Sequence, residues 1–278
     1  MSSSPFLLCA RQELLLAVRS RWTQVFAAVF AGLSLAVAVA GYALSGGHGV
    51  QDFARTSASL VQLVLLLVPL SSLLIGVLSL APERGAADLL FSQPVSRTTI
   101  LLGQSAGLWA ALTAAQAIGF GAAGAVVFSH RGGEGLDGFV LLFAGSSVIT
   151  AVFLGIAALL AAGSAGRRRT RALALALVVW FVAVVLFDVA ALGLASLLRS
   201  GTASRVLIVS VLVNPVGALR TGALLALEGT TAFGTASLAF LRFTKGPAGA
   251  AALLSASLLL WTVVPFALAA RRLSKADV

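Results

Sequence analysis

Six long apolar runs constrain this chain more than any other feature, because each is long enough to cross a membrane. A helix needs about 20 apolar residues to span the roughly 30 Å of hydrocarbon in a bilayer. The runs from Leu60 to Leu80 and from Leu108 to Phe128 carry no formal charge. Of the 278 residues, 59% are hydrophobic and only 10% are charged, which excludes an ordinary soluble domain. We predict an all-α polytopic membrane protein with six transmembrane helices, at Thr23 to Leu44, Ala58 to Ala81, Gly103 to Phe128, Gly138 to Ala162, Ala172 to Leu198 and Gly249 to Ala270.

The residues ahead of the first apolar run predict a helix that lies on the membrane surface. Between Pro5 and Trp22, leucine and valine side chains fall on one side of a helix and arginines lie elsewhere. We assign residues 1–22 to this interfacial helix; the alternative is a charged tail. The apolar run after Arg21 is longer than the about 7 to 15 apolar residues of a signal peptide, so we expect the first span to be retained.

The distribution of positive charge predicts which side each loop faces. The formal net charge of +10 would suggest a nucleic-acid partner in a soluble protein, but in a membrane protein it orients the chain. Twelve Lys and Arg residues fall on the side of both termini and of loop 82–102, against seven, Arg220 included, on the other side. Because cytoplasmic loops carry the excess of positive charge, we expect a multi-pass protein with both termini in the cytoplasm and no nucleic-acid partner. No loop is large enough for a separate domain, so residues 1–278 form a single transmembrane domain.

The fifty residues 199–248, between the fifth and sixth spans, are too apolar for a loop in water. They contain two apolar pieces, Val206 to Val213 and Val216 to Leu227, each too short to cross a membrane. Asn214 and Pro215 separate the two pieces and are typical of a break in a helix. We predict an extracytoplasmic re-entrant helical hairpin that breaks at these two residues; the alternative is two further crossings.

A patterned polar segment interrupts the apolar sequence between the second and third spans. Residues 82–97 combine a helix-favouring stretch that presents Leu89 and Leu90 with a break at Pro94. Ser96 follows at the start of the third span, where its hydroxyl can accept an orphan backbone amide. We predict that Ser96 caps the following helix, and that the segment contacts another protein; the alternative is a short connector.

Asp188 is the only ionisable residue that we place within a predicted span. It lies about eleven residues, or roughly 16 Å along the helix, before Arg199. An ionisable group at that depth is costly and normally faces a partner or a watered cavity. We find no Lys or Arg in the spans to pair with it. Three interpretations remain: a contact in the substrate path or subunit interface, which we extend to Asn214 and Pro215, a structural hydrogen bond, or a protonated carboxyl without a role.

No residue pattern for catalysis or metal binding occurs in the sequence. Residues Gly163 to Arg167 lack the spacing and the Lys-Ser/Thr ending of a phosphate-binding loop, so the chain cannot hydrolyse ATP by itself. His48 and His130 stand alone and Cys9 is the only cysteine, which disfavours a metal cluster and rules out an intrachain disulfide. A Gly-x-Ser-x-Gly nucleophile elbow is also missing. We therefore assign no catalytic and no metal-binding residue.

A compact basic run, Gly166 to Arg171, connects the fourth and fifth spans and holds four arginines. It is typical of a signal that orients the chain and contacts anionic lipid headgroups. The second interpretation is a further contact for a cytoplasmic partner, and the sequence does not separate the two.

The polar interruption resembles a motif of a known family, the permeases of type-2 ABC exporters (ABC-2 permeases). Their cytoplasmic loop between the second and third spans carries the pattern Glu-x-Gly-x-x-x-Leu-Leu-x-Ser-x-Pro-Val-Ser-Arg-x-x-Ile-Leu-Leu-Gly. The matching residues here are Glu83, Gly85, Leu89, Leu90, Ser92, Pro94, Val95, Ser96, Arg97, Ile100, Leu101, Leu102 and Gly103. The interfacial helix, the six spans and the hairpin extend the resemblance over nearly the whole chain. Within the family, the chain is most similar to permeases that serve maturation of a copper enzyme, nitrous oxide reductase, through Arg11-Gln12-Glu13, Leu186-Phe187-Asp188 and Asn214-Pro215 with Arg220 after them.

The resemblance implies a function and a set of partners. In this family the loop holds a coupling helix that docks into a groove of an ATPase subunit. Carried over to residues 82–102, this implies coupling residues Glu83, Gly85, Asp88, Leu89, Leu90, Pro94, Ser96 and Arg97. It also implies an exporter permease of the bacterial inner membrane, which works as a homodimer with two cytoplasmic ATPases. The ATPases bind ATP and Mg, this chain holds no cofactor, and the nitrous oxide reductase subgroup adds a periplasmic partner.

Two other functions remain open at this point. One is a membrane scaffold or anchoring subunit that binds a partner but moves nothing. The other is an ABC-2 exporter of drugs or other small molecules. An intramembrane enzyme is disfavoured, because we find no pair of catalytic residues in the spans.

Overall fold

The computed structural model describes residues 4–43, 50–81, 95–131, 136–162, 169–228 and 235–275, and every regular element in these ranges is helical. The all-α prediction is therefore confirmed for the described residues. In chain order the helices are α1 (Pro5–Arg19), α2 (Arg21–Ala43), α3 (Val50–Leu80), α5 (Arg97–Arg131), α6 (Leu136–Ala161), α7 (Arg169–Phe181), the π-helical turn η2 (Val182–Leu186), α8 (Phe187–Ser196), α9 (Ser200–Val213), α10 (Pro215–Glu228), α11 (Thr235–Phe243) and α12 (Pro247–Lys275).

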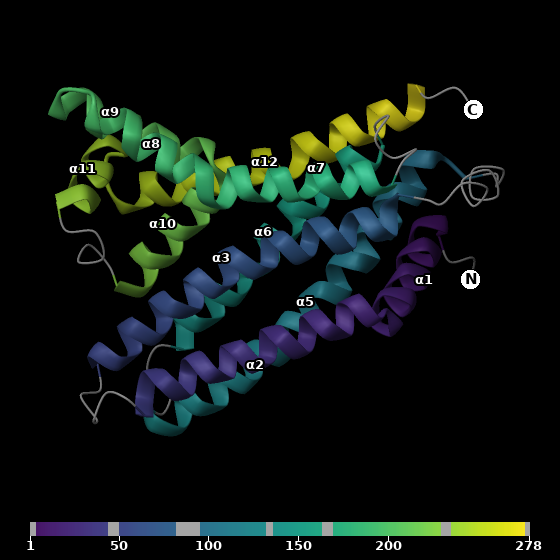
Figure 1. Ribbon diagram of the computed structural model, residues 1–278, viewed down its shortest axis with the longest axis horizontal. Coiled ribbons are helices and arrows are strands. Elements are labelled where there is room, and N and C mark those ends of the chain that lie inside the picture. The colour runs from purple at the N-terminus through teal and green to yellow at the C-terminus, as the bar shows by residue number, and fades with distance from the viewer. Residues whose placement is uncertain are drawn as a thin grey trace.

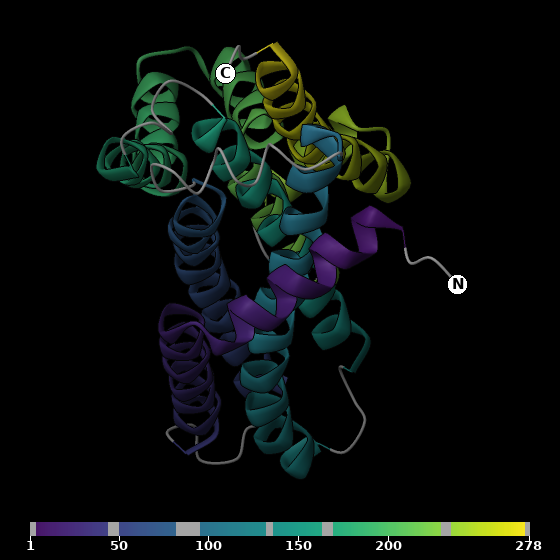
Figure 2. The same ribbon diagram turned by 90° about the vertical axis from the view of Figure 1, so that its right-hand side faces the viewer.

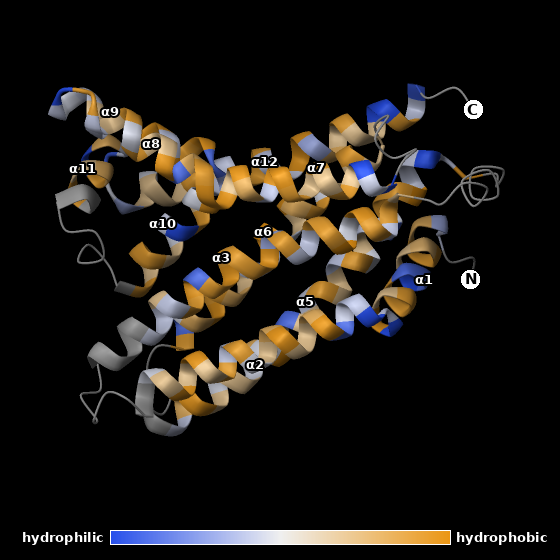
Figure 3. Ribbon diagram, viewed as in Figure 1, coloured by the Kyte–Doolittle hydropathy of each residue, from blue (hydrophilic) through white to orange (hydrophobic). Residues whose placement is uncertain are grey.

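Six of the described helical stretches are long and apolar enough to cross a membrane, which confirms the six predicted spans. Figure 1 shows α1 and the C-terminal end of α12 at the same end of the bundle, as an even number of crossings requires. We call this end the proximal side, and the opposite end, where α9 and α11 lie, the distal side. Hydrophilic residues gather towards the two ends (Figure 3). The spans are Arg21–Gly41, Thr56–Leu80, Arg97–Ser129, Leu136–Ala161, Arg169–Ser196 and Pro247–Lys275.

The main hydrophobic core lies where α2, α3, α5 and α6 pack together. Phe120 of α5 contributes most to its aromatic part, with ring centroids 5.8 Å from Phe30 and 5.4 Å from Phe139. Tilted and edge-to-face pairs of this kind each stabilise by about 0.5–1.5 kcal/mol beyond their buried area. These four helices contribute most of the buried core of the bundle.

The fifth and sixth spans form the edge of the bundle. Only 11% of each is buried in the single chain, compared with about half of the second, third and fourth spans. In a membrane such faces contact lipid or another subunit. The fifth span also contains the π-helical turn η2, an irregularity that often marks a functional position in a helix.

The distal region contains a broken pair of helices, α9 and α10, which bend by 102° at Asn214. Each has 14 residues, about 21 Å at 1.5 Å per residue, so neither alone spans the roughly 30 Å of hydrocarbon. The break therefore falls where Asn214 and Pro215 predicted it. The interpretation of the pair as a re-entrant hairpin stays a prediction.

Candidate functional site

The centre of the predicted coupling segment lies outside the described residues. This applies to Glu83, Gly85, Asp88, Leu89, Leu90 and Pro94. The structure describes both ends of the segment, at the last turn of α3 and at the first turn of α5. We call these the leading flank, Leu78–Ala81, and the trailing flank, Val95–Thr99.

At the trailing flank, Ser96 caps α5. Its hydroxyl oxygen accepts the backbone amide of Thr99 at 3.2 Å and lies 2.7 Å from the Thr99 hydroxyl. The capping prediction is confirmed. The next side chain, Arg97, donates from Nη1 to the carbonyl oxygen of Leu273 at 3.4 Å, near the C-terminal end of α12. A guanidinium is favourable there because the last carbonyls of a helix carry partial negative charge.

At the leading flank, the last turn of α3 is tied to two other helices. The Ser79 hydroxyl donates to Oε1 of Glu13 in α1 at 2.7 Å. Arg169, at the start of α7, donates from Nη2 to the carbonyl oxygen of Leu78 at 2.6 Å. Arg169 belongs to the basic run whose two interpretations were left open, and the structure gives it a third role as a link between spans. The two flanks together connect the segment to α1, α7 and α12.

Glu13 was not singled out by the sequence, because a lone carboxylate in an amphipathic helix normally faces water. Here its side chain is only 7% exposed, and burial raises its pKa above the ordinary value of 4.5, although the hydrogen bond from Ser79 acts in the opposite direction. Of the predicted apolar face, Leu7, Leu8 and Leu15 are exposed, whereas Leu14 is half-buried against the core. The opposite face, with Glu13 and Ala17, is the one that packs on the bundle.

Substituting Glu13 by glutamine is expected to remove a pH dependence of stability. A carboxyl whose folded pKa is raised contributes stability that is fully present below its unfolded pKa and is lost as pH rises through the folded pKa. Glu13→Gln keeps the neutral shape, so its midpoint of thermal unfolding should exceed that of the wild type at neutral pH, and the two should converge towards pH 4.5. Melting curves at several pH values check this, with Gln12→Glu as the control because Gln12 is exposed. A constant offset between the two proteins at every pH contradicts it.

Helix α1 crosses α5 (Figure 2). The two helices are in closest contact at two glycines of α5, Gly103 and Gly107. A Cβ atom at Gly103 would lie 2.7 Å from Cβ of Cys9 and 2.9 Å from the carbonyl oxygen of Phe6. At Gly107 it would lie 2.9 Å from the backbone nitrogen of Leu14 and would overlap the backbone of α1 still more closely elsewhere. This Gly-x-x-x-Gly pair allows the two backbones to approach as in other membrane helix contacts.

The variant Gly107→Ala is therefore expected to lose about 1–3 kcal/mol of stability, the usual cost of forcing extra atoms into a packed contact. Gly121→Ala provides a matched control on the same helix, because a Cβ there meets no atom within 4 Å. Unfolding of both variants by SDS in mixed micelles measures the difference. Equal stability of the two variants would show that α1 is not fixed at this crossing.

Asp188 lies in α8, within the fifth span, and forms an ion pair with Arg220 of α10. The expectation that no Lys or Arg pairs with Asp188 is wrong. The hydropathy pattern assigns Arg220 to the loop between the fifth and sixth spans. In the fold, α10 lies beside the fifth span and brings Arg220 to Asp188. The two side chains are 34% and 23% exposed, so the pair is partly withdrawn from its surroundings.

Asn214 joins the break between α9 and α10 to the fifth span. Its Oδ1 accepts the backbone amide of Val216 at 3.1 Å, which caps α10, and its Nδ2 donates to the carbonyl oxygen of Ala183 in the π-helical turn at 2.7 Å. Pro215 occupies the first position of α10, where its missing amide proton has no cost. The structure thus brings together Asp188, Asn214 and Pro215, the three residues predicted for the substrate path or subunit interface, and it adds Arg220 to them.

The other side of the break is closed by α12. Ser257 donates to the carbonyl oxygen of Leu212 at 2.6 Å, and Trp261 donates from Nε1 to that of Val213 at 2.8 Å. These are carbonyls at the end of α9 that the helix itself leaves unpaired. Broken helices are tolerated at membrane depth only where neighbours satisfy such groups. We call Asp188, Arg220, Asn214, Ser257 and Trp261 the distal polar node.

Two cavities of the described structure lie near this node. One, of about 450 Å³, lies between α8 and α9, and the other, of about 520 Å³, lies between α6, α10, α11 and α12. Neither is lined by Asp188, Asn214 or Pro215. In the described structure Asp188 and Asn214 connect helices, and neither lines these two cavities.

Sequence reasoning missed a second polar cluster, between α5 and α6. Gln116 donates to Oγ1 of Thr150 at 2.8 Å and accepts from the Ser146 hydroxyl, and all three side chains are fully buried. Next to them, the hydroxyls of Thr113 and Ser147 lie 3.3 Å apart. A sequence signal for this cluster does exist: polar residues recur three to four positions apart in each of two consecutive apolar spans. Such interhelical bonds contribute roughly 0.6–2 kcal/mol each in a membrane.

The chain has six spans, and helix α1 packs on the third of them. Hydrogen bonds at both flanks of a proximal loop connect that loop to other helices. Together these features are those of a membrane protein of the permease class. The whole chain supports the same conclusion. Residues 7–278 match the family described as "ABC-2 family transporter protein", and the chain belongs to this family as a permease subunit. The family implies an ABC ATPase on a separate chain.

Two relatives carry the same printed name, "Probable ABC transporter permease protein NosY". The protein of Pseudomonas aeruginosa is 33% identical over 268 residues, which cover 94% of each chain. That of Stutzerimonas stutzeri is 34% identical over 238 residues, which cover 82% of this chain and 85% of the relative.

Proposed function

We propose that this chain is the membrane subunit through which a separate ABC ATPase, using ATP and Mg in the cytoplasm, changes the arrangement of the spans. Two copies of the chain and two ATPases form the working unit. The ATPase binds segment 82–102 on the proximal side, which is the cytoplasmic side. The twelve positive residues assigned to this side, against seven on the other, support the orientation.

One observation carries the proposal: both flanks of the segment are bonded to helices distant in sequence. Ser79 and Leu78 connect the leading flank to α1 and α7, and Arg97 connects the trailing flank to α12. A connector that only joined α3 to α5 has no need of these bonds. With them, a displacement of the segment acts on the fifth and sixth spans as well as on the second and third.

Copurification with the ATPase tests this proposal. The chain is expressed together with an ABC ATPase from the same genome, and binding and ATPase activity are measured on the purified complex. The double variant Leu89→Asp/Leu90→Asp should lose the ATPase, because two charges replace the apolar contact. Leu197→Asp serves as a matched control, since Leu197 is 83% exposed and lies on the distal side. Undiminished ATPase binding by the double variant would overturn the assignment.

Arg97→Gln separates docking from coupling. The variant should still bind the ATPase, but the effect of the membrane subunit on ATP hydrolysis should be lost, because the bond to α12 is removed. If Arg97→Gln leaves ATP hydrolysis by the complex unchanged, and removal of ATP leaves the conformation of the membrane subunit unchanged, the scaffold function is supported instead.

We further propose that the system serves maturation of nitrous oxide reductase. This is supported by the resemblance through Leu186-Phe187-Asp188 and Asn214-Pro215, and by the name NosY of both relatives. The chain has one Met, one Cys and two His, which agrees with copper following another route. A periplasmic partner belongs to this proposal.

Deletion of the gene tests the assignment to the copper enzyme. The deletion strain should contain nitrous oxide reductase without activity and with reduced copper, and the wild-type gene should restore both. The Leu89→Asp/Leu90→Asp variant should not restore them. Normal reductase together with increased sensitivity to drugs would favour the drug-exporter alternative.

A further inference from the structure

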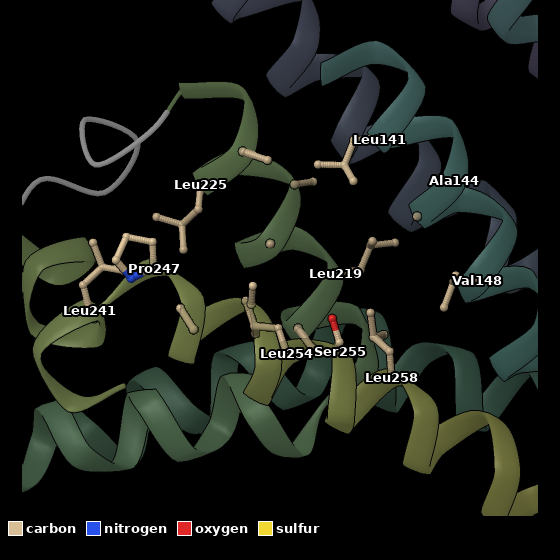
Figure 4. A pocket seen from close by; sticks show the side chains of 17 residues that line it. Leu141, Ala144, Val148, Leu219, Leu225, Leu241, Pro247, Leu254, Ser255 and Leu258 are labelled. Carbon is tan, nitrogen blue, oxygen red and sulfur yellow. The ribbon is translucent and has the colours of Figure 1, made fainter. Parts of the chain in front are cut away.

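The groove between α6, α10, α11 and α12 lies on the distal half of the bundle and has a volume of about 520 Å³ (Figure 4). Its walls are almost entirely aliphatic, and Ser255 contributes the only side-chain hydroxyl among the 17 lining residues. An ordered water needs two to four polar partners. A single hydroxyl does not provide them, so the groove is suited to an apolar occupant.

The groove is open to the membrane along one side. Leu141 and Val148, on the α6 wall, are 50% and 39% exposed, and Ser255 and Ala251 on the α12 wall are also exposed. A ligand can therefore enter laterally from the lipid phase rather than through the water.

The length of the groove matches one leaflet of a bilayer. Its α12 wall runs from Pro247 to Leu258, twelve residues that rise about 16 Å along the helix. Half of the roughly 30 Å hydrocarbon core is about 15 Å. The groove thus extends from the distal interface to near the membrane centre, as an acyl chain does.

The turn beside the distal mouth of the groove carries two exposed cations. Leu241 and Pro247 line this end, and the turn between them carries Arg242 and Lys245, both exposed. The first turn of α12 begins at the same place and adds the partial positive charge of a helix N-terminus. A phosphate group fits a site of this charge.

The backbone fixes Lys245 at this position. Its φ of 60° is left-handed, a conformation in which glycine is the usual residue at the end of a helix. The amide of Gly246 bonds the carbonyl of Leu241 at 2.8 Å, and the buried Thr244 hydroxyl bonds that of Phe240 at 3.0 Å. Lys245 therefore occupies a position that glycine would adopt with less strain. Its side chain adds a positive charge beside the mouth of the groove.

From these features we propose that the groove binds one acyl chain of an anionic phospholipid from the distal leaflet, with the phosphate at Arg242 and Lys245. The lipid fills the space between α10 and the sixth span and so supports the broken helix pair. The proposal does not depend on the ATPase or on the substrate of the transporter.

Photolabelling tests this site. The full chain is placed in lipid nanodiscs that contain phosphatidylglycerol or phosphatidylcholine with a diazirine in the acyl chain, and labelled peptides are identified by mass spectrometry. Phosphatidylglycerol should label α6 and α12 along the groove. Gly222→Phe should reduce this labelling about tenfold, since the new ring occupies the volume of several methylene groups. A Cβ at Gly222 meets only Leu254, at 3.7 Å, so the variant is expected to fold.

Two further variants make the result specific. Gly193→Phe is the matched control, because a Cβ there meets no atom within 4 Å and the residue is outside the groove. The double variant Arg242→Gln/Lys245→Gly should lose the preference for phosphatidylglycerol. Labelling by phosphatidylglycerol should fall about fivefold for each charge removed, while labelling by phosphatidylcholine should not change. The glycine also suits the left-handed conformation, so loss of folding is not expected. Equal labelling of Gly222→Phe and Gly193→Phe, or crosslinks from the groove to a second copy of the chain, would overturn the proposal.

Discussion

Replacement of Arg220 by alanine is expected to destabilise the folded protein by about 2–4 kcal/mol, because the polar side chain of Asp188 then lies in the fifth span without its partner. Asp188→Ala should have a similar effect through the unpaired guanidinium. The double variant Asp188→Leu/Arg220→Met should recover most of the loss, since apolar residues of similar volume often replace a buried ion pair at little cost. Unfolding by SDS, analysed as a double-mutant cycle, measures the coupling between the two side chains.

The same cycle separates structure from function. Additive losses from the two single variants would show that the ion pair does not couple α8 to α10. A stable double variant that binds the ATPase but no longer responds to it would give the pair a role in the conformational change. If the double variant retains full activity, Asp188 is a structural residue.

Substitution of Asn214 by alanine is expected to cost about 2–3 kcal/mol. It removes the cap of α10, worth about 0.5–2 kcal/mol, and leaves the half-buried carbonyl of Ala183 without its side-chain donor, worth about 1–3 kcal/mol. Asn214→Ser keeps a hydroxyl acceptor for the Val216 amide but cannot bond Ala183, so it should show roughly half of the loss.

The control for Asn214 is Ser210→Ala. Ser210 lies one turn earlier and bonds only the carbonyl of Leu207 within its own helix, at 2.7 Å, so its loss should be small. Thermal unfolding in nanodiscs compares the three variants. A serine variant as stable as the wild type would show that the bond to the π-helical turn contributes nothing.

Features that depend on neighbouring residues in the sequence could be predicted from it. The spans follow from runs of apolar residues, the break from Asn214-Pro215, and the cap from the position of Ser96 before the third span; all three agree with the structure. The N-terminal helix was also found, but the face that packs on the bundle was not. That face is set by Gly103 and Gly107 on another helix, and two glycines among 28 gave too weak a signal.

Contacts between distant residues could not be predicted in the same way. Asp188 and Arg220 are 32 positions apart, and a hydropathy window assigns the arginine to a loop although the broken helix pair carries it back to the fifth span. Glu13 and Ser79 are separated by 66 positions, and neither residue alone indicates a buried bond. The roles of Glu83, Gly85, Asp88, Leu89, Leu90 and Pro94 remain predictions, as does that of Arg97 in coupling.

The ion pair of Asp188 and Arg220 has a consequence for biosynthesis. Asp188 leaves the ribosome 32 residues ahead of Arg220, and at about 5–20 residues per second this interval lasts roughly 2–6 s. During that time the fifth span carries a carboxylate that lacks its guanidinium, and it enters lipid less readily than its apolar residues suggest. We therefore expect the span and the broken helix pair to reach their final depth together, so that the 60 residues from Arg169 to Glu228 insert as one unit.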